Sequence, residues 1–302
     1  MNIVSLLPSA TEICAALGLR LSAVSHECDY PPEVAALPRI TSSILGHGLS
    51  QGEIDAAVSA AVREGRSLYQ VDAALLGELA PDLIVTQGLC DVCAVTEDTV
   101  FSAMGALPKD VVERTVVLSL DARSVDGVFD DVRRVAAAAG VSERGEALIA
   151  GLIERWATLL VRADGRARRG RLAFVEWADP PFTGGHWVPE MIQAAGGIDV
   201  LGAAGVDSAR TTWAAIEGAE PEVIVVGCCG YGLHDNTQTA RRLLERPEIA
   251  AMFAVRAGRL WAVDANSMFS RPAPRLVRGA EVLEHILHGD GADLPGEAAR
   301  IT

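Results

Sequence analysis

Long apolar runs, aromatic residues and positive charge are all scarce in this sequence. No uninterrupted apolar stretch reaches the ~20 residues of a membrane-spanning helix, so membrane insertion is not expected. Residues 1–7 carry no basic side chain before a short apolar run, which differs from an export signal and predicts a cytoplasmic protein. With 40 acidic against 26 basic residues, the net charge of −14 disfavours nucleic acid and anionic lipid as partners.

The composition favours a helix-rich α/β protein. Aromatic residues make up 5% of the chain, while half of the residues are hydrophobic, mostly Ala, Val and Leu. The basic cluster from Arg162 to Arg171 is short and interrupted by Asp164 and Gly165, so we interpret it as a solvated linker. Cysteines in the cytoplasm are normally reduced, so the six here are not expected to form three disulfides: Cys14, Cys28, Cys90, Cys93, Cys228 and Cys229.

The chain opens with a strand pattern and a helix pattern. Residues 3–7 are strand-like, and the helix that follows ends near Gly18. Ser9 and Glu12 have the spacing of a capping box. In α/β proteins the turn between a strand and such a helix is a common ligand site. Ser9, Thr11 and Glu12 are therefore candidate ligand-binding residues, with a simple helix cap as the alternative.

Two segments of the chain resemble each other. Ala80–Val85 and Glu220–Val225 each combine a helix end, a proline and a buried strand. Each strand leads into a loop with glycine and cysteine, at Gly88–Cys90 and Gly227–Gly230, and each half then adds another strand and helix. Two alike halves predict two Rossmann-like lobes whose equivalent loops line one ligand cleft between them.

The region between the halves has a helical pattern from Ser124 to Ala163, with a break at Gly140. The predicted fold class is therefore α/β, with two Rossmann-like lobes joined by a long helical connector. We divide the chain into an N-terminal α/β lobe (1–123), a helical connector (124–165), a C-terminal α/β lobe (166–289) and a tail (290–302). The glycines, aspartates and proline of the tail predict that it frays.

Four motifs carry a resemblance to a known family. They are the opening Ser5–Glu12, the stretch Asp29–Pro32, the pair Pro180–Gly185 and Ala195–Gly197, and the turn Phe269–Arg275. In this order and spacing they resemble the helical-backbone (class III) substrate-binding proteins, which include the vitamin B12-binding and iron–siderophore-binding periplasmic proteins. The resemblance spans nearly the whole chain and implies a two-lobed fold that binds a small molecule or metal chelate.

The chain also departs from that family. Family members are normally exported and deliver ligand to a membrane permease, and without an export signal we do not expect docking to a permease. Exported relatives hold the corrinoid between aromatic side chains, yet no tryptophan stands near Ser42–Ile44 or Thr86–Gln87. Tyr30 and Trp187 are the predicted aromatic surface for a flat macrocycle.

Soft and ionisable residues gather in the predicted loops of the first lobe. His26 and Cys28 lie two residues apart, and Cys90 and Cys93 form a C-x-x-C pair. Three thiolates and an imidazole suit a zinc site, and soft thiolates also suit iron in Fe–S clusters. The alternatives are a redox dithiol or cysteines that only fill space in the core.

The sequence thus supports two hypotheses. The first is a cytoplasmic binding protein for a corrinoid-like or metal-containing ligand. The second is a metal- or thiol-dependent enzyme on the same fold, in which His26, Cys28, Cys90 and Cys93 react and nearby carboxylates act as acid–base groups. We favour the first and leave catalysis open. The predicted ligand-binding residues are Ser9, Thr11, Glu12, Tyr30, Gln87, Asp91, Glu176, Gly185, His186, Trp187, Tyr231 and Arg271.

Overall fold

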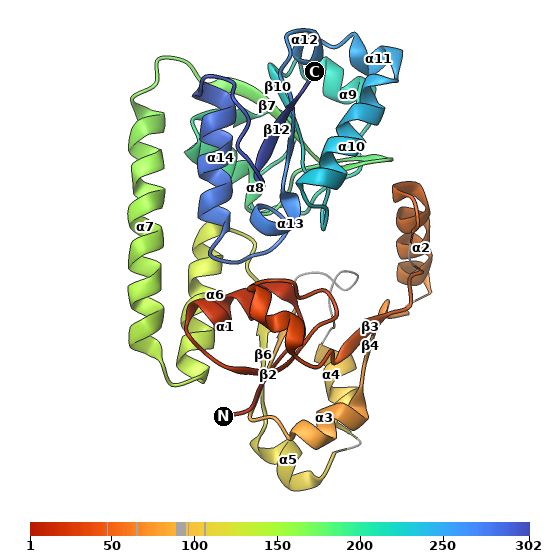
Figure 1. The fold of residues 1–302 in the computed structure, drawn as a ribbon, viewed down its shortest axis with the longest axis vertical. Helices are drawn as coiled ribbons and strands as arrows, with labels where there is room; N and C mark the ends of the chain where they lie inside the picture. The colour runs from red at the N-terminus through yellow and green to blue at the C-terminus, as the bar shows by residue number, and fades with distance from the viewer. Residues whose placement is uncertain (47, 65, 89–94, 96, 106) are drawn as a thin grey trace. The chain divides into compact units, whose positions relative to one another are not determined.

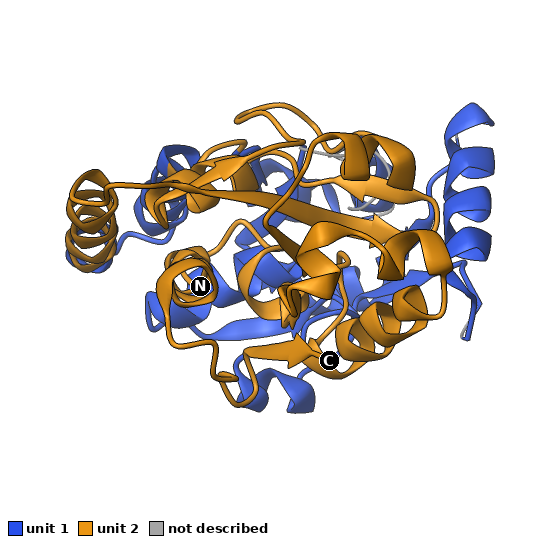
Figure 2. Ribbon diagram, turned by 90° about the horizontal axis from the view of Figure 1, so that it is seen from above, with its two compact units in different colours: residues 1–122, 126–150 blue, residues 123–125, 151–302 orange. Residues whose placement is uncertain are grey.

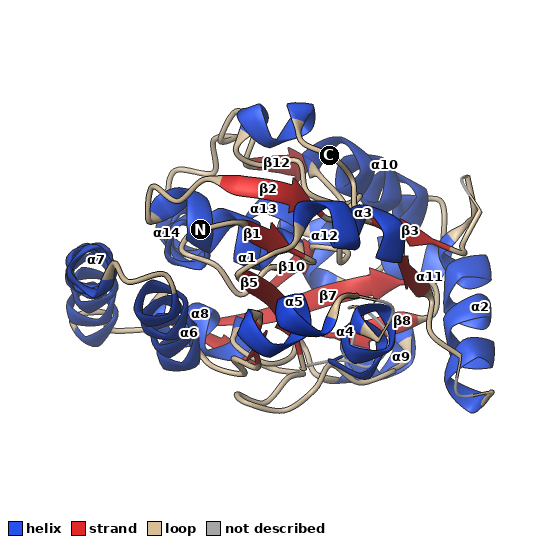
Figure 3. Cartoon of the chain, turned by 90° about the horizontal axis from the view of Figure 1, so that it is seen from below, coloured by secondary structure: helices blue, strands red, loops and turns tan. Residues whose placement is uncertain are grey.

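The computed structural model describes residues 1–46, 48–64, 66–88, 95, 97–105 and 107–302 (Figure 1). They form two compact units, coloured separately in Figure 2. Unit 1 comprises residues 1–122 and 126–150, and unit 2 comprises residues 123–125 and 151–302. Each unit combines parallel strands with helices (Figure 3), which confirms the predicted α/β class. The boundaries of the lobes and the connector remain predictions.

Unit 1 is built on a parallel sheet with strand order β2-β1-β5-β6. A separate antiparallel pair, β3-β4, completes its strands in the described residues. Its elements are β1 (Ile3–Ser5), α1 (Pro8–Ala16), β2 (Leu21–Val24), a 3-10 helix (Pro32–Ala36), β3 (Thr41–Ser43), α2 (Gln51–Arg63), β4 (Tyr69–Val71), α3 (Ala73–Leu79), β5 (Leu83–Gln87), α4 (Glu97–Met104), α5 (Lys109–Arg114), β6 (Val116–Leu120) and α6 (Val125–Ala138).

The strands of unit 1 are short apolar runs because both faces of the sheet are covered. Side chains of each strand point alternately to the two faces of the sheet. On one face, Val4, Ala23 and Ile84 pack in a buried cluster with residues of α3 and α4. No helix within the described residues has the length and apolar character needed to cross a membrane.

Helix α1 differs from the prediction at its first turn. It begins at Pro8 with Leu7 as N-cap and has no side-chain cap, so the expected capping box of Ser9 and Glu12 is wrong. Proline has no N–H to satisfy and its fixed φ suits the first helical position, so it sets the helix start without a capping side chain. A capping box does form in α2, where Ser50 and Glu53 exchange hydrogen bonds.

The predicted repeat is confirmed at the level of the backbone. Ala80 and Glu220 have φ of 44° and 47°, and each is followed by a proline and a buried strand. The left-handed conformation ends the helix before the strand. It also avoids the right-handed helical region that is disfavoured for a residue preceding proline. Both halves therefore enter their strands through the same turn.

The connecting helices are α6 and α7 (Ser142–Asp164), and the predicted break at Gly140 is confirmed. Gly140 has φ of +70°, which glycine adopts without strain, and the next helix starts two residues later. A Cβ on Gly145 would lie 2.7 Å from Cβ of Ala136, so this glycine allows α6 and α7 to approach closely.

Unit 2 is built on a sheet with strand order β12-β11-β10-β7-β8, with β9 also paired to β7. The strands β9, β7, β10 and β11 are parallel, and β8 and β12 are antiparallel to their neighbours. The elements are β7 (Gly170–Ala178), β8 (Pro181–Thr183), α8 (Val188–Ala194), β9 (Gly197–Asp199), α9 (Trp213–Gly218), β10 (Val223–Val226), α10 (Leu233–Leu244), α11 (Pro247–Ala250), α12 (Phe253–Arg256), β11 (Leu260–Val263), α13 (Ala265–Met268), α14 (Leu276–His288) and β12 (Ala298–Ile301).

The C-terminal tail is ordered as a strand, so the predicted fraying is wrong. Strand β12 pairs with β11 over Leu260–Val263, and Ile301 is buried in the core of unit 2. The glycine-rich stretch before it only forms the turn that returns the chain to the sheet. The local composition gave no sign of this pairing, because its hydrogen bonds come from a strand about forty residues earlier in the chain.

Candidate functional site

In unit 2, the polar residues predicted from the sequence lie where parallel strands end. Glu176 is near the end of β7, the loop 227–232 follows β10, and residues 264–271 follow β11. The carboxyl ends of neighbouring parallel strands share one edge of the sheet, which is the usual ligand-binding edge of an open α/β fold. The predicted residues Glu176, Tyr231 and Arg271 therefore belong to one edge.

Hydrogen bonds tie the two loops after β10 and β11 together. The N–H of Gly230 donates to Ser270 Oγ at 3.2 Å, and the N–H of Asn266 donates to the carbonyl of Tyr231 at 2.9 Å. Arg271 is 6% exposed and donates to Asn266 Oδ1 at 2.7 Å. The loops thus form one connected platform rather than two independent segments.

Asn236 supports this platform and was missed by the sequence analysis. Its side chain accepts from the N–H of Cys228 at 2.9 Å. It also donates to the carbonyls of Tyr231 at 3.1 Å and Val263 at 2.9 Å. Asn236 is fully buried. In the sequence it stands four residues before Ala240 on the apolar side of α10, and a polar residue at such a position indicates a hydrogen-bonding role.

Glu176 lies next to the turn that follows β8. Its Oε2 accepts from the N–H of Gly185 at 3.1 Å, and its carboxylate also accepts from the Ser208 side chain. Burial raises the pKa of Glu176 to about 7, because desolvation outweighs these two hydrogen bonds. The carboxyl group therefore changes its charge near neutral pH.

The loop 203–211 packs against the turn after β8 and is held there by contacts with His186. The N–H of His186 donates to the carbonyl of Val206 at 2.7 Å, and the N–H of Gly205 donates back to the carbonyl of His186 at 2.8 Å. Nε2 of His186 lies 3.1 Å from Asp207 Oδ1. Burial lowers the pKa of His186, and the nearby Asp207 carboxylate opposes this effect.

Two aromatic side chains at this edge, Trp187 and Tyr231, differ in how accessible they are to a ligand. Trp187 is 4% exposed, and its indole N–H donates to the carbonyl of Phe269 at 2.7 Å. This burial argues against the predicted role of Trp187 as a stacking surface for a ligand, because the ring is packed inside unit 2 and is not accessible. Tyr231 is half-buried and meets Trp177 edge-on with ring centroids 5.6 Å apart, so Tyr231 is the better aromatic candidate.

In unit 1 the predicted residues follow β1, β2 and β5. The hydroxyl of Thr11 is fully buried, 2.8 Å from Ser5 Oγ and 3.1 Å from Cys28 Sγ. Ser9 and Glu12 are also buried, and Ser9 Oγ has no hydrogen-bond partner among the described residues. The three predicted ligand-binding residues of α1 are therefore buried inside unit 1. Tyr30, in contrast, is 42% exposed, so its ring is partly accessible to solvent.

The four predicted metal ligands are only partly described. Cys90 and Cys93, together with the predicted ligand-binding residue Asp91, lie outside the described residues. Cys28 is 2% exposed, and Nδ1 of His26 lies 2.7 Å from Thr41 Oγ1. Among the described residues, no three or more His, Cys, Asp or Glu side chains are grouped to hold a metal ion. The zinc or iron site stays a prediction.

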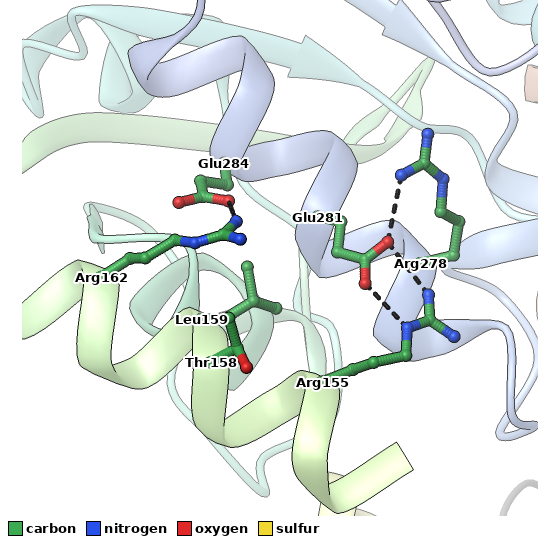
Figure 4. A pocket seen from close by; sticks show the side chains of 7 residues that line it. All are labelled: Arg155, Thr158, Leu159, Arg162, Arg278, Glu281 and Glu284. Carbon is green, nitrogen blue, oxygen red and sulfur yellow. Dashed lines mark hydrogen bonds and ion pairs between the residues drawn. The ribbon is translucent and has the colours of Figure 1, made fainter. Parts of the chain in front are cut away.

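A pocket of about 340 Å³ lies elsewhere, between α7 and α14 (Figure 4). Arg155 donates to both carboxylate oxygens of Glu281, at 2.8 and 3.0 Å. Arg162 donates to Glu284 at 2.9 Å. Because these charges already satisfy one another, we interpret the pocket as a gap in a helix–helix interface. Its lining contains none of the predicted site residues: Arg155, Thr158, Leu159, Arg162, Arg278, Glu281 and Glu284.

The basic cluster at the end of α7 is mostly exposed and leads into β7, in agreement with its interpretation as a solvated linker, and it also forms ion pairs. Arg162 and Arg166 both donate to Glu284, and Arg168 pairs with Glu222. These ion pairs join the end of α7 to α14 and the segment before β7 to the start of β10, all within unit 2. Networks of several charges stabilise more reliably than isolated surface pairs.

Comparison with known proteins identifies the family. Residues 70–266 match the family model described as "Periplasmic binding protein". The chain belongs to this family. The class of substrate-binding protein predicted from the sequence is therefore confirmed. No curated protein sequence matches the chain.

Solved periplasmic binding proteins share its fold. The heme-binding protein RhuT from Roseiflexus sp. RS-1 is 24% identical with a TM-score of 0.69, covering 94% of this chain and 97% of its own. The vitamin B12-binding protein BtuF of Vibrio cholerae is 20% identical with a TM-score of 0.61, covering 94% and 95%. The heme-binding protein HutB of Vibrio cholerae is 16% identical with a TM-score of 0.70, covering 95% and 99%. At these identities the similarity shows the fold.

Proposed function

We propose that this periplasmic binding protein binds a metal chelate with a flat macrocycle, of the corrinoid or heme type. Its family membership carries the proposal, because structurally similar members are described as binders of heme and vitamin B12. The ligand would contact residues at the carboxyl edge of the parallel strands of unit 2. Tyr231, which is half-buried, supplies an aromatic face for the macrocycle.

Calorimetric titration with hemin, cobalamin and cobinamide tests the proposal. We expect saturable one-site binding of at least one of these chelates. Tyr231→Ala removes an aromatic contact of about 1 kcal/mol and is expected to weaken that binding roughly fivefold.

Phe253→Ala is the matched control for this variant. Phe253 is an aromatic residue of α12, is 72% exposed and precedes β11, so it belongs to the opposite end of that strand. Its substitution should leave the affinity unchanged. Absence of heat and of any spectral change with all three chelates would reject the proposed ligand class.

A further inference from the structure

Loop 203–211 of unit 2 is an exposed segment that lies over buried residues. Every residue from 203 to 210 is exposed except Ser208, which is partly buried. In the turn that the loop contacts, residues 183–185 and Trp187 are buried. The loop therefore buries little apolar surface of its own, and segments of this kind open at a lower free-energy cost than the core.

Polar contacts and close backbone packing hold the loop on this turn. The N–H of Thr183 donates to the carbonyl of Ala209 at 2.9 Å, and the N–H of Ala209 donates to Thr183 Oγ1 at 3.2 Å. The backbone of Ser208 approaches Gly185 so closely that a Cβ on Gly185 would lie 2.8 Å from Cα of Ser208. The closed loop thus lies directly on the turn after β8.

The Ser208 side chain connects the loop to Glu176. It donates to the Glu176 carboxylate, which also accepts from the N–H of Gly185 at 3.1 Å. An ionised carboxylate has about four acceptor positions, so water that enters an opened loop would solvate it more completely than these two donors do. Opening of the loop is therefore favoured when Glu176 is charged.

A protonated Glu176 keeps both contacts of the closed loop. One oxygen still accepts from the N–H of Gly185, and the new O–H group can donate to Ser208 Oγ, because a hydroxyl group both donates and accepts. Protonation therefore removes the cost of burying a charge without breaking the contact to the loop. In agreement, burial raises the pKa of Glu176 to about 7 from its ordinary value of 4.5.

A second carboxyl group, that of Asp199, lies at the base of the loop. Its Oδ1 accepts from the N–H groups of Leu201 at 2.9 Å and Gly202 at 3.0 Å, whereas its Oδ2 is buried and has no hydrogen-bond partner among the described residues. A Cβ on Gly202 would contact both Oδ2, at 2.9 Å, and the carbonyl oxygen of Gly184, so these two acceptors border the same small space. Burial raises the pKa of Asp199, which again favours the protonated form while the loop is closed.

His186 acts in the opposite direction. Burial lowers its pKa, so the stability that neutral His186 contributes to the closed loop is lost as the pH falls below the ordinary value of 6.5. The other charged side chains and the thiol on the elements around Glu176 are Arg123, Asp179, Glu190, Asp207, Arg210 and Cys229. All of these groups are also present in a Glu176→Gln variant, so their titration cancels when it is compared with the wild type.

We propose that loop 203–211 is a pH-sensitive cover at the carboxyl end of β7, and that its opening is linked to the loss of a proton from Glu176. The stabilisation by this proton is fully present below pH 4.5 and is lost as the pH rises through 7, so the loop opens more often. The inference goes beyond the proposed function, because the linkage does not need a bound ligand.

Amide hydrogen exchange of the ligand-free protein tests this linkage. Exchange in peptides covering residues 183–187 and 203–211 is measured at pH 6 and pH 8 and corrected for the intrinsic effect of pH on exchange. Between these pH values the opening constant of the wild type should rise roughly tenfold more than that of Glu176→Gln, for a carboxyl pKa of about 7 in the closed loop and 4.5 in the open loop. Glu154→Gln on the exposed face of α7 removes one charge elsewhere and should behave like the wild type.

An equal pH dependence in the wild type and Glu176→Gln would overturn the inference. So would a difference that is equally large in peptides of α10, because exchange would then report unfolding of the whole of unit 2. Carbon-13 NMR of the Glu176 carboxyl group gives a check that needs no variant: titration near pH 7 supports the linkage, and titration near pH 4.5 overturns it. None of these results depends on whether a chelate binds, so failure of the proposed function would leave the inference intact.

Discussion

Gly185→Ala is expected to lower the thermal unfolding midpoint of unit 2 by roughly 5–10 °C. A Cβ at this position would lie 2.8 Å from the carbonyl carbon of Asp207 and from Cα of Ser208, and closer still to the Ser208 nitrogen. These are backbone atoms, which cannot rotate away as a side chain can. The loop 203–211 would have to move, and Glu176 would lose the alignment of its two donors.

Gly151→Ala is the matched control for this substitution. Gly151 lies inside α7, and a Cβ there meets no atom within 4 Å. Alanine is the better helix former by up to about 1 kcal/mol, so the midpoint should rise slightly or stay the same. Calorimetric unfolding measures both variants. Equal midpoints for Gly185→Ala and wild type would show that the loop is not packed against Gly185.

Glu176→Gln is expected to stabilise the protein at pH 8 but not at pH 4.5. The folded pKa of about 7 lies above the ordinary value of 4.5, so the folded state binds the proton more tightly than the unfolded state. The stability that this proton contributes is present below pH 4.5 and is lost as the pH rises through 7. A difference of this size corresponds to about 3 kcal/mol at most. Glutamine, which cannot ionise, avoids the loss.

The measurement is the unfolding midpoint of both proteins between pH 4.5 and 8. The midpoint of Glu176→Gln relative to wild type should increase with pH. The titration of His186 is present in both proteins and cancels in the comparison. Glu154→Gln on the exposed face of α7 controls for the loss of one charge and should have little effect at any pH. A constant difference between Glu176→Gln and wild type would contradict the raised pKa.

The sequence was sufficient to predict the fold class because the starts and ends of these strands and helices are set by residues close to them in the chain. The helix end, proline and buried strand of 80–85 and 220–225 recur as the same turn in both units. The break between α6 and α7 occurs at a glycine with positive φ, as its position in the pattern indicated. These features depend on neighbouring residues, which a sequence shows directly.

The errors arose where distant residues decide the outcome. Strand β12 forms because β11 offers an open edge, and nothing within residues 290–302 indicates this. Trp187 is buried and its indole N–H donates to the carbonyl of Phe269, 82 positions along the chain. At Ser9 two local rules competed, and the fixed φ of Pro8 decided where the helix starts.

The sequence could predict which residues follow parallel strands, but not the contacts that these residues make. Residues that follow parallel strands gather at the carboxyl edge, so the strand pattern predicted that Glu176 and Tyr231 lie near one another, and the turn motif Phe269–Arg275 drew attention to Arg271. The raised pKa of Glu176 and the support from Asn236 depend on tertiary contacts with Gly185 and with the loop after β10. The same holds for the orientation of the His26 ring, whose Nδ1 lies 2.7 Å from Oγ1 of Thr41, fifteen residues away.

The most direct test of the account is amide hydrogen exchange of the full chain with and without a saturating chelate, hemin or cobinamide. The central claim is that the ligand binds at the carboxyl edge of the parallel strands of unit 2. It predicts slower exchange in peptides covering residues 184–187 and 228–231. Exchange in residues 247–256, which precede β11, should stay the same. Binding without protection of the first two segments, or with protection mainly at 247–256, would contradict the account.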